Sequence, residues 1–306
     1  MTSNAQEMNP QLLLPFQRVG VGTPLVLVHG YLGGSSQWDA QLPQLSQHFE
    51  VVTLDLAGYG MANYLAAPTD LADHARNVLA TLDHMGIERF HLLGHSMGGM
   101  VVQEITRQAP HRVNKLVLYA TGPLGCIPGR FETMARSRER LRDDGLQRTA
   151  RRICATWLLD YEDSPGFETL AALATQASEQ AASAGLSAME SWDGREHLGQ
   201  IAQSTLVIWG ECDRTYGWPQ IEMLWRSIPH ASLAVLPACA HALHLERSAL
   251  FCTLLIEFLI RGENTHLTKT GLLKKNLGHT ARFATLATTI IFLAASVPVR
   301  SFSISW

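Results

Sequence analysis

The stretch that decides the fold of this chain is residues 90–99, FHLLGHSMGG. Its first half is an apolar run typical of a buried strand, and residues 100–105 begin a helical pattern. Between the two, Gly94, Ser96 and Gly98 alternate with larger residues. A sharp turn from strand to helix strains the φ/ψ of its central residue and crowds the backbone on both sides, so it needs small neighbours. The spacing therefore predicts a strand–turn–helix unit with Ser96 at its apex.

Five further apolar runs have the same character as the first half of that stretch. Each holds four to six residues rich in Val, Ile and Leu; they are residues 25–28, 51–55, 115–119, 205–209 and 232–236. Such runs, without polar alternation, are typical of strands buried on both faces of a parallel sheet. The segments between them are long enough for crossover helices. The sequence thus predicts a doubly wound α/β fold with a mostly parallel central sheet flanked by helices.

One interval interrupts this alternation. About 85 residues between Tyr119 and Thr205 carry no strand signal, and residues 131–186 show a helical pattern. At this length a helical cap inserted over the sheet is favoured over ordinary crossover helices. The expected organisation is a core in two parts, residues 1–124 and 201–262, a helical cap at 125–200, and an atypical basic and apolar tail at 263–306.

Composition limits the class of protein. The 306 residues are 46% hydrophobic and 17% charged, which is typical of a globular chain. A net charge of −3 argues against a nucleic-acid partner. The five cysteines are odd in number and widely spaced, so a disulfide framework is not expected, and a reducing compartment fits better. Because residues 1–10 show no secretory signal, the predicted location is cytoplasmic.

The tail differs from the rest of the chain. Residues 263–306 hold five basic residues and one acidic residue, a net charge of +4. Within them, residues 283–299 are 17 residues without a charge. As a helix they would span about 25 Å, just short of the roughly 30 Å hydrocarbon core. Membrane association through residues 283–299 is therefore the alternative location, although several Thr and Ser residues make the segment only moderately apolar.

Several motifs taken together resemble the α/β-hydrolase family over about residues 15–260. They are the Gly-x-Ser-x-Gly turn at 94–98, an oxyanion-type loop at 28–34 (VHGYLGG), a turn at 55–60 (DLAGYG), an acid-bearing strand end at 208–213 (IWGECD) and a base-bearing segment at 240–246 (AHALHLE). The loop and the turn look like those after the family's third and fourth strands. The sequence departs from the family at Ala240, where glycine is usual, and it leaves little room for the usual first strand.

The resemblance implies a catalytic triad. Ser96 would attack a carbonyl carbon, His241 would take and later return the proton, and Asp213 would orient the imidazole. Glu211 lies on the same segment as Asp213 and is the alternative acid. The backbone N–H groups of Tyr31 and Met97 would form the oxyanion hole.

The other histidines of these motifs have plainer expected roles. His95 and His29 are expected to be structural, with His29 anchoring its loop. A zinc site at His241 and His244 is disfavoured, because His-x-x-His lacks the i,i+4 spacing and central Glu of a zincin helix. No metal and no cofactor is expected.

The substrate pocket is predicted from the cap. Aromatic and sulfur-bearing side chains of the expected cap are the candidate lining residues, namely Trp157, Tyr161, Met189 and Trp192. Nothing suggests a charged pocket, so a small or medium, mostly apolar ester or lactone is the expected substrate. A carbon–carbon bond hydrolase of ring-cleavage products and an acyltransferase remain alternatives on the same fold. So does a ligand-binding or receptor protein with a vestigial triad. The oligomeric state is left open.

Overall fold

All six apolar runs form strands of one sheet in the computed structural model, which describes residues 12–128 and 132–260. A seventh strand precedes them. In chain order the strands are β1 (Phe16–Val19), β2 (Pro24–Val28), β3 (Glu50–Leu54), β4 (Phe90–His95), β5 (Val113–Tyr119), β6 (Ser204–Gly210) and β7 (Ala231–Leu236). The order across the sheet is β1-β3-β2-β4-β5-β6-β7, and every neighbouring pair is parallel except β1 with β3. The predicted α/β class is confirmed.

Strand β1 was not predicted from its sequence. It is the short edge strand FQRV, and its first three residues are exposed. An edge strand with polar residues gives no continuous apolar run. Within the described residues, β1 is the one strand ahead of β2.

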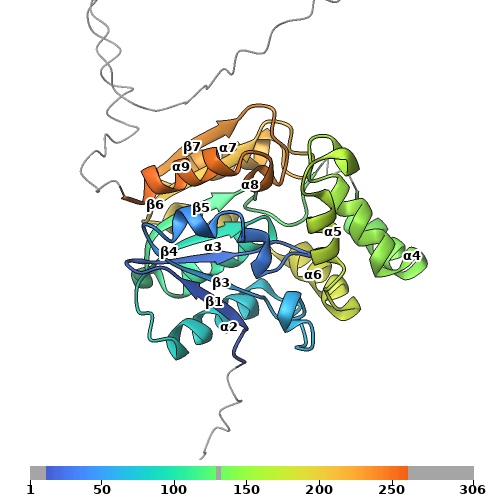
Figure 1. Ribbon diagram of the computed structural model, residues 1–306, viewed down its shortest axis with the longest axis horizontal. Coiled ribbons are helices and arrows are strands. Elements are labelled where there is room, and N and C mark those ends of the chain that lie inside the picture. The colour runs from blue at the N-terminus through green and yellow to red at the C-terminus, as the bar shows by residue number, and fades with distance from the viewer. Residues whose placement is uncertain (1–11, 129–131, 261–306) are drawn as a thin grey trace, which may run out of the picture.

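Helices cover both faces of the sheet (Figure 1). Along β2, Val26 and Val28 pack in a cluster with α2 (Leu71–His84), α3 (Met97–Gln108) and α7 (Trp218–Ser227). Leu25 and Leu27 pack in a second cluster with α1 (Leu42–Leu45) and α9 (Ser248–Ile260). Because successive strand residues point to opposite faces, burial on both sides explains the unbroken apolar runs.

The segment predicted as the cap is helical and stands to one side of the sheet in Figure 1. It contains α4 (Met134–Ala155), α5 (Phe167–Ala174) and α6 (Glu179–Ser191), and α4 packs on the other two. Gly145 has a φ of 77° and kinks α4. An antiparallel bridge between Leu124 and Asp193 joins the two ends of the segment. The remaining helical turns are short: η1 (Ser35–Trp38), η2 (Gly60–Ala62), η3 (Pro110–Arg112), η4 (Tyr161–Asp163), η5 (Arg195–Gln200) and α8 (Leu243–Glu246).

The apolar segment at residues 283–299 lies outside the described residues. In the part of the chain that is described, no helix combines the length and the apolar character needed to cross a membrane.

Candidate active site

Ser96 occupies the apex of the turn between β4 and α3. Its φ of 55° and ψ of −119° are strained values for a residue with a side chain. A Cβ on Gly94 would lie 2.2 Å from the carbonyl oxygen of Gly98, and one on Gly98 would lie 2.3 Å from that of His29. Larger residues therefore cannot replace either glycine without moving backbone. This is the crowding that the sequence predicts.

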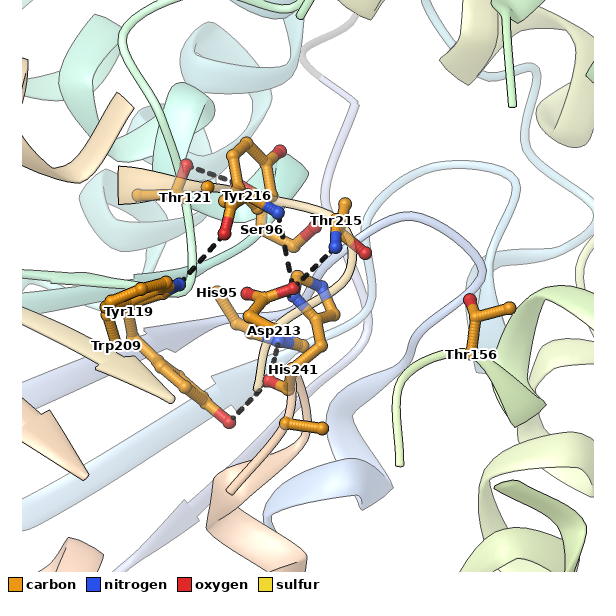
Figure 2. Close-up of polar contacts among 12 residues, drawn as sticks. His95, Ser96, Tyr119, Thr121, Thr156, Trp209, Asp213, Thr215, Tyr216 and His241 are labelled. Carbon is orange, nitrogen blue, oxygen red and sulfur yellow. Dashed lines mark hydrogen bonds and ion pairs between the residues drawn. The ribbon is translucent and has the colours of Figure 1, made fainter. Parts of the chain in front are cut away.

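The backbone of Ser96 is held by the end of β5. Its N–H donates to the carbonyl oxygen of Tyr119 at 3.0 Å, and its own carbonyl accepts the Thr121 hydroxyl at 2.7 Å. These bonds fix the strained turn to the neighbouring strand (Figure 2).

His241 and Asp213 form a buried pair beside Ser96 (Figure 2). The imidazole Nδ1–H donates to Asp213 Oδ2 at 2.9 Å, and both side chains are fully buried. Asp213 Oδ1 accepts the backbone N–H groups of Thr215 at 2.7 Å and Tyr216 at 3.2 Å. Glu211, the alternative acid, is exposed. The structure therefore pairs Asp213, and not Glu211, with the histidine.

The other imidazole nitrogen of His241 is open to a new partner. Nε2 is buried and has no hydrogen-bond partner among the described residues, so it is not bonded to Ser96 Oγ in this structure. Such bonds are often long without substrate and tighten when the reacting complex forms.

The two backbone segments named in the oxyanion-hole prediction both lie beside Ser96. Met97 is the first residue of α3, so its N–H has no partner within the helix. The loop before Tyr31 passes close by, because a Cβ on Gly30 would lie 3.0 Å from Ser96 Cβ. The Tyr31 hydroxyl donates to the carbonyl of Ala182 at 2.8 Å, which ties this loop to α6.

A small cavity opens on Ser96. Its volume is about 20 Å³, little more than the ~10–15 Å³ that one water needs. No charged side chain lines it, and its lining consists of Tyr31, Ser96, Gly125, Ile127, Met134, Ile153, Trp157, Met189, Thr215 and Tyr216. Most of these side chains are apolar or aromatic, and several come from α4, α6 and the segments around them.

The structure places two of the four predicted lining residues at the cavity and two away from it. Trp157 and Met189 line the cavity. Tyr161 is 48% exposed and lies under the guanidinium of Arg214, 4.2 Å from its ring centre. Trp192 is buried elsewhere and donates from Nε1 to Glu104. Aromatic character predicts that a side chain packs against other residues, but it does not predict whether that side chain faces the cavity.

Two cavity residues that follow the acid were not predicted from the sequence. Thr215 and Tyr216 both line the cavity, and the Tyr216 ring stacks on His241 with centroids 5.8 Å apart. Their position in the chain could have indicated them, because the second and third residues after a triad acid lie on the same loop as the acid.

The three other histidines of the family motifs, His29, His95 and His244, are buried. His29 Nε2 accepts the Leu56 N–H at 2.9 Å and its Nδ1–H donates to the Gly30 carbonyl at 2.8 Å, so it anchors the loop as predicted. Burial lowers the pKa of His244 to about 3 and holds the pKa of His95 well below its usual range. His244 Nδ1 faces the Tyr119 hydroxyl at 2.9 Å. Residues 12–128 and 132–260 hold no group of three or more His, Cys, Asp or Glu placed as metal ligands.

The sheet order, the strained serine turn and the buried acid–histidine pair are together the features of a hydrolase. A family model described as "alpha/beta hydrolase fold" matches residues 23–248. The chain belongs to the α/β-hydrolase fold family.

Relatives within that family differ in their named activities. The dihydrolipoyllysine-residue acetyltransferase component of an acetoin cleaving system from Pseudomonas putida is 34% identical over 245 residues, which are 78% of this chain and 64% of that relative. This chain thus spans less than two thirds of it. A pimeloyl-[acyl-carrier protein] methyl ester esterase from Edwardsiella ictaluri is 30% identical, covering 76% of this chain and 92% of the esterase. A solved hydrolase from Pseudomonas aeruginosa PA01 superposes with a TM-score of 0.73 at 29% identity, covering 81% of this chain and 94% of that one.

Proposed function

We propose that this chain is a serine hydrolase that cleaves a carboxylic ester or lactone through an acyl-enzyme on Ser96. The observation that carries the proposal is the pairing of Asp213 with His241 at 2.9 Å, beside a serine on a strained strand–helix turn. A serine hydroxyl is a poor nucleophile until a base removes its proton. Nε2 of His241 is the unbonded nitrogen that can act as that base.

The proposed chemistry has two stages. Ser96 Oγ attacks the carbonyl carbon while His241 Nε2 takes its proton. The leaving alcohol then departs with that proton, and the acyl group stays on Ser96. In the second stage His241 Nε2 takes a proton from water, which attacks the acyl-enzyme. The same proton then passes to Ser96 Oγ as the acid is released. Asp213 holds the Nδ1–H tautomer and stabilises the imidazolium at both stages.

The negative oxygen of each tetrahedral intermediate needs donors in place beforehand. The Met97 N–H at the start of α3 is one proposed donor, and the helix N-terminus adds a favourable partial charge. The Tyr31 N–H is the other, on the loop beside Ser96. Loss of one such donor costs about 10²–10³ in rate.

The cavity supports an uncharged substrate group. A charged acyl group would lose its hydration among the apolar lining residues, with no ion-pairing side chain there to offset the loss. Because the cavity is scarcely larger than one water, we expect the helices α4 and α6 to move when substrate enters. The esterase among the relatives favours an ester over other acyl compounds.

Acyl transfer is a second candidate. It is favoured by the name of the Pseudomonas putida relative, and it would use the same acyl-enzyme. An alcohol in place of water would then capture the acyl group. Product analysis with added methanol separates the two: a methyl ester in large excess over free acid favours transfer.

The proposed function is tested by a panel of p-nitrophenyl esters of rising chain length together with a set of lactones. Wild type is expected to hydrolyse short and medium acyl groups, and Ser96→Ala to hydrolyse none. Equal rates for the two proteins would contradict the proposal. Treatment of wild type with a competing fluorophosphonate should likewise abolish hydrolysis.

A further inference from the structure

Tyr119, the last residue of β5, contacts both halves of the proposed Ser–His pair. Its carbonyl oxygen accepts the Ser96 N–H at 3.0 Å. Its hydroxyl donates to the carbonyl oxygen of His241 at 3.0 Å (Figure 2). One residue of the sheet therefore holds the backbone of the nucleophile and the backbone of the base.

The contacts at the Tyr119 hydroxyl account for its one proton and two acceptor positions. It donates to His241, and it accepts from the His244 N–H at 3.1 Å and from His244 Nδ1 at 2.9 Å. The last contact requires the Nδ1–H tautomer of His244. A side-chain amide of Gln41 holds the next peptide by donating to the His244 carbonyl at 2.7 Å.

A second side chain, that of His95, contacts the same His241 carbonyl as the Tyr119 hydroxyl. His95 Nε2 faces the His241 oxygen at 3.2 Å, and its other nitrogen lies 3.4 Å from the amide of Gln37. Its ring stacks on that of Tyr119 with centroids 4.5 Å apart. His95 is 4% exposed and Tyr119 is fully buried, so water does not compete for these bonds.

From this geometry we infer that Tyr119 and His95 are positioning residues, which set where the His241 imidazole stands relative to Ser96. The inference rests on the proposed function of that pair. Ser96 Oγ and His241 Nε2 must come into line during the reaction, and a misplacement of about 1 Å costs on the order of 10² in rate. Neither residue is among those that line the cavity, so we expect their substitution to leave substrate binding unaffected.

The first test is Tyr119→Phe, which keeps the ring and removes the hydroxyl. We expect kcat to fall about 10- to 100-fold and KM to stay within about twofold. Thr81→Val is the matched control. The Thr81 hydroxyl is fully buried, donates to one backbone carbonyl and accepts one backbone N–H, but it lies in α2 outside the cavity lining. This control is expected to lower Tm without lowering kcat.

A double-mutant cycle separates positioning from loose packing. In a His241→Ala background, Tyr119→Phe should cause no further loss of the residual rate, because the group it positions is gone. The same further loss in both backgrounds would overturn the inference, as would an unchanged kcat in the single variant.

A second pair of variants gives an answer even if Tyr119→Phe does not fold. The amide nitrogen of His95→Gln can replace Nε2 and reach the His241 carbonyl, whereas the shorter His95→Asn cannot. The Gln variant should retain at least tenfold more kcat than the Asn variant at similar Tm. Equal kcat values would refute positioning by His95. If Ser96→Ala were active, the proposed function itself would fail, and this is a separate result.

Discussion

His74 makes a quantitative prediction about the acid stability of the fold. It lies in α2 and is fully buried. Burial lowers the pKa of His74 to about 4, from about 6.5 in the unfolded chain. The folded protein therefore binds the proton less readily than the unfolded chain.

The sign and size of the effect follow from linkage. Above the unfolded pKa of about 6.5 both states are neutral and stability is complete. As pH falls from 6.5 toward 4 the unfolded chain alone gains the proton, so stability is lost through that window and levels off below it. Each pH unit in which only the unfolded chain is protonated costs about 1.4 kcal/mol of unfolding free energy. Between pH 7 and pH 5 about one and a half such units are crossed, so His74 accounts for a loss of about 2 kcal/mol.

The assay is urea unfolding of wild type and His74→Leu at both pH values. Leu is similar in volume, suits a helix and cannot titrate. The difference in unfolding free energy between pH 7 and pH 5 should be smaller in the variant by about 2 kcal/mol. His111→Gln, at an exposed histidine, is the control and should behave as wild type. Parallel pH dependences for wild type and His74→Leu would refute the reasoning.

Other predictions follow from the site. Asp213→Asn should lower kcat about 10⁴-fold through the wrong imidazole tautomer, whereas Glu211→Gln should be mild in the same steady-state assay; the reverse ranking would mean that the acid is misassigned. Thr215 Oγ1 is buried with no partner within the described chain, so Thr215→Val should leave the unfolding free energy unchanged or raise it by up to about 1 kcal/mol in urea. A loss above about 1 kcal/mol would show that the hydroxyl has a partner such as bound water. A chain ending at Gly262 should stay folded and active in circular dichroism and ester assays, because the triad and every strand of the described chain lie before residue 261; aggregation would mean that the tail packs on the fold.

The sheet could be predicted because it is buried on both faces. That burial gives β2 to β6 their continuous runs rich in Val, Ile and Leu. β7, at the other edge of the sheet, has a similar run with Ser232 exposed. The edge strand β1 has one partner strand and exposed residues, so its sequence carries no such run. The helices of the predicted cap were recognised as a group because a long interval of the sequence carries no strand signal.

The site was predicted only where chemistry restricts the sequence. Gly94 and Gly98 are required by backbone crowding around Ser96, and this restriction is local. The lining of the cavity is not local. Trp157 and Tyr161 are four residues apart, yet one faces the cavity and the other is 48% exposed. The contact of Tyr119 with His241 joins residues 122 apart in the chain, and no spacing rule predicts it.

The most direct test of the central claim is the site of covalent labelling. The chain is treated with a fluorophosphonate, digested, and the modified peptide is identified by mass spectrometry, with Ser96→Ala treated in parallel. We expect one adduct, on Ser96, no adduct in the variant, and a loss of turnover in the variant of about 10⁶. An adduct on another residue, or turnover by Ser96→Ala close to that of wild type, would contradict it.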